Sequence, residues 1–369
     1  MAARVTEIEP VPGPEAFDRR TSDARLSQAA VILSVGAAVA GETDRIEPSA
    51  QFPLPRVSRL ERKEKVALAE AAEPLRVDTG EYVRGEVGMI PREETSRIAH
   101  RLYDDPAPEM AAALVEAGLH SPDRLIRTAS AAAALDTTGP RDEVFAILED
   151  SAGAREETTR DIARTALAKV APQHPRLSRL VTRPKRIEQR QEPSHTAVLS
   201  HGTFASNAQW WRPGGDFYSY LDGLQPALPM HTESFQWSGA YSAGARSLAA
   251  DQLETWLGAS NLNIPDFFAH SHGVTVANLA TKNGLQLNRL VMLGWPVHDQ
   301  WLPDLSRVTK LISFRVRVDL VIIVDGGSQS LPPALVGSPK VKEHVHGWFR
   351  HSAPHEQEYW ERHGLASLL

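Results

Sequence analysis

The sequence contains no cysteine, little net charge and no apolar run long enough to cross a membrane. The missing thiols exclude disulfide bonds, cysteine nucleophiles and thiolate metal sites. The net charge of −6 provides no basic field that would attract nucleic acid. The apolar run 29–40 has twelve residues, whereas a membrane-spanning helix needs about 20. The composition therefore predicts a soluble globular protein without a transmembrane span.

The run 29–40 raises the question of a targeting signal. It ends in Ala38-Val39-Ala40, which suits a signal-peptidase site. The 28 residues before it carry five acidic side chains, however, and a signal peptide has a short basic leader. We therefore expect a buried N-terminal helix or strand in a cytoplasmic protein, with secretion as the alternative.

Aromatic residues are scarce in the first half of the chain. Five of them precede residue 195, and all eight tryptophans follow it. The first half is rich in Ala, Glu and Arg, and its apolar residues recur at helical spacing. The predicted helices are 60–72, 93–103, 108–117, 122–135, 141–149 and 156–170. This half is predicted to be an all-α domain.

Two of the predicted helices share a short motif. The sequence Arg-Thr-Ala-Ser-Ala-Ala at 127–132 returns as Arg-Thr-Ala-Leu-Ala-Lys at 164–169, an offset of 37 residues. This spacing of short paired helices resembles HEAT or armadillo repeats, of which two or three units would be present. An unrelated helical bundle is the alternative. The helices show no catalytic cluster, so we expect them to pack, to bind a protein partner or to cover the second domain.

The pattern changes after a charged, proline-bounded segment at 183–195, which is predicted to be a linker. Beyond it, strand-like and helix-like segments alternate, which indicates a parallel, three-layer α/β sheet domain. The predicted strands are 196–200, 264–269, 290–293 and 311–318, and the predicted helices are 244–258 and 274–283. The predicted organisation is an extension (1–58), a helical domain (59–182), the linker (183–195) and a catalytic domain (196–369).

The most informative motif is Ala269-His-Ser-His-Gly273, between a predicted strand and a predicted helix. This is typical of a nucleophile elbow, in which a tight turn presents one hydroxyl at the start of a helix. The turn requires small residues two before and two after the serine, as Ala269 and Gly273 are. The usual first residue is glycine, but a methyl group can still fit. Ser271 is therefore the candidate nucleophile.

A serine nucleophile needs a histidine base and a carboxylate that orients it. Asp319 follows the predicted strand 311–318, and Asp325 is the alternative acid if the strand continues through Asp319. His351 is the candidate base, with His355 as its competitor. The order Ser, Asp, His along the chain is that of the α/β-hydrolases.

A polar loop after the first predicted strand offers hydrogen-bond donors for an oxyanion. In His201-Gly202-Thr203-Phe204, the glycine lets the backbone turn toward a substrate. The N–H groups of Thr203 or Phe204, together with that of His272 at a helix start, would stabilise an oxyanion.

Residues 196–369 thus resemble the α/β-hydrolase superfamily of serine esterases and lipases. The resemblance implies a Ser-His-Asp catalytic triad, an oxyanion hole and no cofactor. In that family a glutamate often follows the catalytic histidine by five residues, and Glu356 has this spacing from His351. The expected reaction is cleavage of a carboxylic ester of a small-molecule or acyl substrate. The alternatives are a thioesterase, an amidase, an acyltransferase, or a non-catalytic helical-repeat scaffold with a hydrolase-like domain.

Histidine pairs offer a metal site as a competing interpretation. His270 and His272, like His344 and His346, have the His-x-His spacing that can bind zinc on a strand. No Asp-His continuation follows, so polar or surface roles explain these residues more simply and no metal is predicted.

Aromatic residues after the oxyanion loop suggest an apolar entrance to a substrate-binding site. The predicted substrate-binding residues are Trp210, Trp211, Phe217 and Trp237. Only 47 residues separate Ser271 from Asp319, so a large cap domain between them is missing. The hypothesis follows that the helical domain serves as the lid, which a truncation near residue 190 would test.

Overall fold

The computed structural model describes residues 22–41, 98–99, 101–104, 107–182, 196–224, 228–262 and 264–369. The predicted helix 60–72 and the predicted linker 183–195 lie outside these residues. Among the described residues, no helix is long and apolar enough to cross a membrane.

Contacts divide the described chain into two compact units. The first, here called the helical unit, comprises the described residues up to Leu167 together with Ile323–Gly326. The second, here called the sheet unit, comprises Ala168–Ile322 and Gly327–Leu369 within the described ranges. The division lies upstream of the predicted linker, because the Ser206 hydroxyl donates to Leu180 O and the Thr182 N–H donates to Ser238 O, all within the sheet unit.

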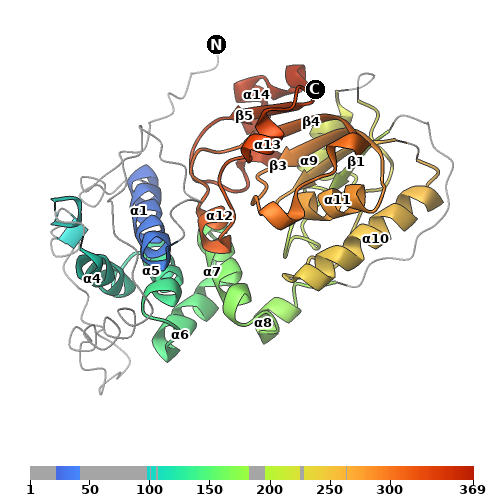
Figure 1. The fold of residues 1–369 in the computed structure, drawn as a ribbon. Coiled ribbons are helices and arrows are strands. Elements are labelled where there is room, and N and C mark those ends of the chain that lie inside the picture. The colour runs from blue at the N-terminus through green and yellow to red at the C-terminus, as the bar shows by residue number, and fades with distance from the viewer. Residues whose placement is uncertain are drawn as a thin grey trace, which may run out of the picture. The chain divides into compact units, whose positions relative to one another are not determined.

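The described part of the helical unit is built from helices (Figure 1). Their bounds are α1 (Ser22–Ala40), α4 (Pro108–Leu119), α5 (Arg124–Thr137), α6 (Asp142–Ser151) and α7 (Glu157–Val170), of which α7 runs into the sheet unit. The predicted helices in this region agree with α4 to α7 within two residues. The apolar run 29–40 forms most of α1, and its side chains are buried against α4 and α5. It is a helix, one of the two predicted alternatives.

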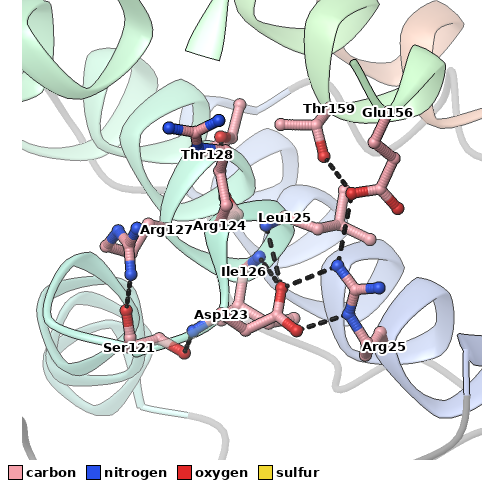
Figure 2. Close-up of polar contacts among 10 residues, drawn as sticks. All are labelled: Arg25, Ser121, Asp123, Arg124, Leu125, Ile126, Arg127, Thr128, Glu156 and Thr159. Atoms are coloured by element: carbon pink, nitrogen blue, oxygen red, sulfur yellow. Dashed lines mark hydrogen bonds and ion pairs between the residues drawn. The ribbon is translucent and has the colours of Figure 1, made fainter. Parts of the chain in front are cut away.

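Polar side chains fix the helix ends in this unit (Figure 2). Asp123 caps α5, because its Oδ1 accepts the N–H groups of Leu125 (2.9 Å) and Ile126 (3.3 Å). The Arg25 guanidinium, from α1, binds the Asp123 carboxylate and also Glu156 Oε2, at 3.2 Å. One cation therefore joins α1 to the starts of α5 and α7.

The repeated motif has a structural counterpart. Arg127 lies in α5 and donates to Ser121 O, just beyond the end of α4. Arg164 lies in α7 and donates to Ala152 O, just beyond the end of α6, at 3.0 Å. Each arginine places its charge where carbonyl groups at a helix C-terminus are left without intrahelical donors.

The sheet unit is α/β. Its described strands are β1 (Ala197–Ser200), β2 (Asp266–His270), β3 (Leu287–Leu293), β4 (Val308–Arg315) and β5 (Val341–Val345). They form one parallel sheet in the order β1-β2-β3-β4-β5. Residues 230 and 235 form isolated parallel bridges to β1 on its other side. Four strands were predicted at these places, whereas β5 was not placed.

Helices cover both faces of this sheet (Figure 1). On one face, α10 (Ala243–Ala259) and α11 (His272–Lys282) pack on strand residues such as Phe267 and Met292. On the other, α9 (Asp216–Asp222) and α14 (Gln357–His363) pack on residues such as Phe268 and Val291. Successive strand residues thus face opposite layers, as strand geometry requires.

The other named helices among the described residues are short. They are α8 (Pro175–Ser178), α12 (Leu320–Asp325), α13 (Pro333–Val336) and the 3-10 turns Asp299–Trp301, Leu305–Arg307, Ala353–His355 and Leu365–Leu368. Because all strands are parallel, their carboxyl ends lie at one edge of the sheet. Side chains in the loops that follow these ends are brought together there.

Candidate active site

Ser271 occupies a sharp turn between β2, which ends at His270, and α11, which begins at His272. Its backbone has φ 53° and ψ −132°, a conformation that non-glycine residues rarely adopt. The Ser271 N–H donates to Leu293 O on β3 at 2.8 Å, which holds the turn against the sheet. A strained serine between a strand and a helix is the geometry expected of a nucleophile elbow.

Close backbone contacts explain the small residues around this serine. A Cβ on Gly273 would lie 2.4 Å from His201 O, and a Cβ on Gly202 would lie 2.7 Å from the Ser271 Cβ. The loop after β1 therefore touches the turn after β2, with space only for hydrogen at both glycines. Ala269 is fully buried, and its methyl group would lie 3.7 Å from a Cβ on Gly273, an ordinary contact. Alanine thus fits where glycine is usual.

Asp319 and His351 form a buried pair. The Asp319 Oδ2 accepts the His351 Nδ1–H at 2.7 Å, and the two side chains are 1% and 8% exposed. The other carboxylate oxygen, Oδ1, accepts the N–H groups of Val321 (3.0 Å) and Ile322 (3.2 Å) in α12. These bonds set the carboxylate's orientation, and the carboxylate fixes the tautomer of the imidazole so that Nε2 is free of a proton.

Two contacts bring His351 to the serine turn. His270, directly before Ser271, donates from Nε2 to His351 O at 3.0 Å. Gly294, directly after the Leu293 carbonyl that holds Ser271, lies beside the imidazole, since a Cβ on this glycine would lie 3.6 Å from His351 Cε1. The structure thus brings together all three predicted triad members, from the ends of β2, β4 and β5.

The competing candidates, His355 and Asp325, make other contacts. His355 stacks on Trp210, with ring centroids 3.9 Å apart and an interplanar angle of 9°. Burial lowers the pKa of His355 to about 3, so this ring is a neutral packing group. Asp325 is the last residue of α12, and the carboxylate that binds His351 is that of Asp319. The Asp325 alternative assumed that the strand continues through Asp319. Strand β4 instead ends at Arg315, before Asp319.

The predicted oxyanion donors differ in whether their backbone N–H groups already make a hydrogen bond within the protein. The Phe204 N–H donates to Gly239 O at 2.9 Å, so this donor is already used, contrary to its predicted role. Thr203 precedes it in the same turn, and its hydroxyl is buried without a hydrogen-bond partner among the described residues. His272 is the first residue of α11, where backbone N–H groups point out of the helix end. Thr203 and His272 are the remaining pair of backbone candidates.

Most of the predicted substrate-binding residues are core residues. Trp211, Phe217 and Trp237 are 2%, 1% and 0% exposed and belong to the two hydrophobic clusters of the sheet. Side chains this deeply packed stabilise the layers and offer no surface to a substrate, contrary to the prediction. Trp210 is half-buried.

The His-x-His residues near the serine have separate hydrogen-bond partners. His272 Nδ1 is 3.2 Å from Thr275 Oγ1, whereas His270 binds His351 O. Burial lowers the pKa of His270 well below its usual value, and the nearby His355 and His351 lower it further. His201 is also buried, between the rings of Trp211 and Trp237, and burial lowers its pKa to about 4. His270 and His201 are therefore neutral structural groups around the serine.

One residue at the site was missed by sequence reasoning. The Gln329 Oε1 accepts the Asp319 N–H at 2.8 Å, and the Gln329 Nε2 donates to Asp319 O at 3.1 Å. A lone glutamine ten residues from an aspartate carries no sequence signal for such a pairing, since the contact depends on the path of the loop.

Searches of protein-family models and of curated proteins find no match to this chain.

Proposed function

We propose that the sheet unit is a serine hydrolase of the α/β-hydrolase kind, which cleaves carboxylic esters through Ser271, His351 and Asp319. The observation that carries the proposal is the strained Ser271 turn with the buried Asp319–His351 pair beside it. Backbone strain of this kind is concentrated at functional sites, because the surrounding structure must hold it. A serine that only closed a turn would need neither the strain nor a histidine already oriented by a carboxylate.

The reaction would proceed in two acyl transfers. His351 Nε2 takes the proton of the Ser271 hydroxyl while Oγ bonds to the ester carbonyl carbon. The resulting oxyanion is stabilised by the N–H groups of Thr203 and His272. The intermediate collapses, the alcohol leaves with the proton from His351, and an acyl-serine remains. Water then repeats the sequence and releases the acid.

The surroundings of the serine support a water-poor site. Ser271 is 8% exposed, and buried neutral rings of His201, His270 and His355 surround the turn. Electrostatic stabilisation of the oxyanion is stronger in such an environment than in water. The His351 imidazole pairs with the Asp319 carboxylate in these surroundings.

Assays with p-nitrophenyl esters and acyl-thioesters of varied chain length would test the proposal. We expect ester hydrolysis that Ser271→Ala reduces by at least about 10³-fold. Ser219→Ala, on the exposed face of α9, is the matched control and should leave the rate unchanged. Faster turnover of thioesters than of esters would favour the thioesterase alternative. Absence of turnover of any acyl substrate by the folded protein would favour the non-catalytic scaffold.

For the helical unit we propose a HEAT-like repeat. The support is the pair of equivalent arginines, Arg127 and Arg164, each bound to the end of the preceding helix. Such units stack through shared apolar faces and commonly bind protein partners on their exposed side.

A further inference from the structure

We propose that Gln329 is a positioning residue for the catalytic carboxylate, acting as a clasp on the main chain of Asp319. This inference rests on the proposed function, since it assigns a role within the same site. The side chain of Gln329 uses both ends of its amide on one residue, accepting from Asp319 N and donating to Asp319 O. It is 2% exposed, so these bonds are made away from solvent.

The burial of this amide needs an explanation. A buried glutamine loses its hydration, and the loss is recovered only through well-made hydrogen bonds. Among the described residues, both of its amide groups bind Asp319 and no other residue. The amide therefore stabilises one peptide segment, the one that carries the acid.

Gln329 is itself held on both sides. Ser328 exchanges two backbone hydrogen bonds with Val297, at 2.7 and 3.2 Å, in the segment after β3. On the other side, the Leu331 N–H lies 3.4 Å from Glu343 Oε1 on β5, and this glutamate is paired with Arg315 on β4. The clasp thus connects Asp319 to a loop that is anchored to three strands or their extensions.

The geometry of Asp319 explains why such a clasp matters. Its Oδ1 is held by α12 and its Oδ2 holds His351, so both oxygens depend on where the main chain of residue 319 lies. A displacement of that main chain would rotate the imidazole away from the serine. Displacements of about 1 Å at a catalytic group can cost about 10²-fold in rate.

Two variants separate positioning from general stability. Gln329→Met keeps the volume but removes both hydrogen bonds, and we expect kcat to fall about 10-fold or more with KM changed less than twofold. Gln329→Glu keeps the shape and the acceptor for Asp319 N–H. When ionised, however, it loses the donor to Asp319 O and adds a negative charge beside the Asp319–His351 pair. Negative charge favours the protonated imidazole, so the acidic limb of the kcat/KM profile should move up by roughly one pH unit.

The measurement is the pH profile of ester hydrolysis by full-length protein, with rates normalised to serine sites titrated by a fluorophosphonate. Gln173→Glu, on an exposed turn, makes the same chemical change away from the site and should leave the profile in place. A higher pH-independent kcat in Gln329→Glu than in Gln329→Met would support the clasp, because the glutamate still accepts the Asp319 N–H.

The outcomes are distinct. If the wild-type enzyme is active and Gln329→Glu changes neither kcat nor the acidic limb of the pH profile, the positioning role of Gln329 is overturned and the proposed function stays intact. Lower thermal stability with wild-type kcat and pH profile would assign Gln329 a purely structural role and would also overturn it. Wild-type protein without acyl hydrolysis would instead overturn the proposed function itself.

Discussion

The two units of this chain differ in where they hold strain and in what their buried polar groups do. In the described helical unit, polar side chains cap helices or pair with each other, as Arg25 does with Asp123 and Glu156. In the sheet unit, residues other than glycine adopt positive φ, and burial keeps His201 and His355 neutral. The non-glycine residues with positive φ among those described are Phe204, Asn261, Ile264, Ser271 and Phe349, all in the sheet unit.

Three of these strained residues belong to the site. Phe204 lies in the loop that touches the serine turn, Ser271 is the candidate nucleophile, and Phe349 lies two residues before His351. Phe349 also bridges to Asp319 and accepts the Leu320 N–H at 3.4 Å. Strain persists only where neighbours hold it in place, so its clustering around Ser271 supports the active site that we propose in the sheet unit.

The largest expected effect comes from the acid. Asp319→Asn should lower kcat by roughly 10⁴-fold, because an amide no longer fixes the imidazole tautomer or stabilises its charged form. Steady-state hydrolysis of a p-nitrophenyl ester measures this. The matched control is Asp325→Asn, for which we expect a change below about 10-fold. A larger loss in the control than in Asp319→Asn would show that the acid was assigned wrongly.

The next effect concerns the contact between the two loops. Gly202→Ala introduces a methyl group at 2.7 Å from the Ser271 Cβ, so the oxyanion loop or the serine must shift. We expect kcat/KM to fall about 10²- to 10³-fold, the range seen when an oxyanion donor is lost. Gly258→Ala, in α10 with nothing within 4 Å of its Cβ position, should be neutral in rate. Equal rates for the two variants would contradict the described contact.

A third effect tests the neutral histidines. The folded pKa values of His201 and His355, about 4 and about 3, lie below the value of about 6.5 in an unfolded chain. As the pH falls below 6.5, the unfolded chain binds protons that the folded chain does not, so stability decreases. The sheet unit should therefore lose free energy of unfolding between pH 7 and 4.5.

Urea denaturation followed by tryptophan fluorescence measures this loss, because all eight tryptophans lie in the sheet unit. The variant His355→Phe keeps a ring on Trp210 but does not titrate. It should retain about 2 kcal/mol more of its pH 7 stability at pH 4.5 than the wild type does. Identical pH dependence in the two proteins would show that His355 is not held neutral by the fold.

The smallest effect lies in the helical unit. Arg25→Met removes the bonds to Asp123 and Glu156, and we expect a loss of about 1 kcal/mol in thermal denaturation followed by circular dichroism. Arg124→Met breaks an exposed pair with Asp150 and should cost less than about 0.5 kcal/mol. Neither change should alter ester hydrolysis. A changed kcat in Arg25→Met would show that the helical unit contributes to ester hydrolysis, contrary to our expectation that its role is structural.

The sequence was a good guide wherever a local pattern determines the structure. Helical spacing predicted α4 to α7, and small residues around Ser271 predicted the turn, because both depend on neighbours in the chain. Burial could not be predicted in the same way. Trp211, Phe217 and Trp237 follow the oxyanion loop in sequence, but the layers on the two sheet faces enclose them. Aromatic composition does not distinguish a core from a binding surface.

Contacts between distant loops were also beyond sequence reasoning. The bond from Phe204 N–H to Gly239 O removes an expected oxyanion donor, and it joins two residues that are far apart in the sequence. The clasp of Gln329 on Asp319 depends likewise on the anchoring of residue 328 to residue 297. The order of the proposed triad residues can be read along the chain, whereas the groups that hold these residues in place are determined by tertiary structure.

The most direct test of the central claim is covalent labelling of the folded full-length protein with a fluorophosphonate, followed by peptide mapping. We predict one adduct per chain, located on Ser271, that disappears in Ser271→Ala and after heat denaturation. Labelling elsewhere, labelling that persists in Ser271→Ala, or no labelling of the folded protein would contradict it.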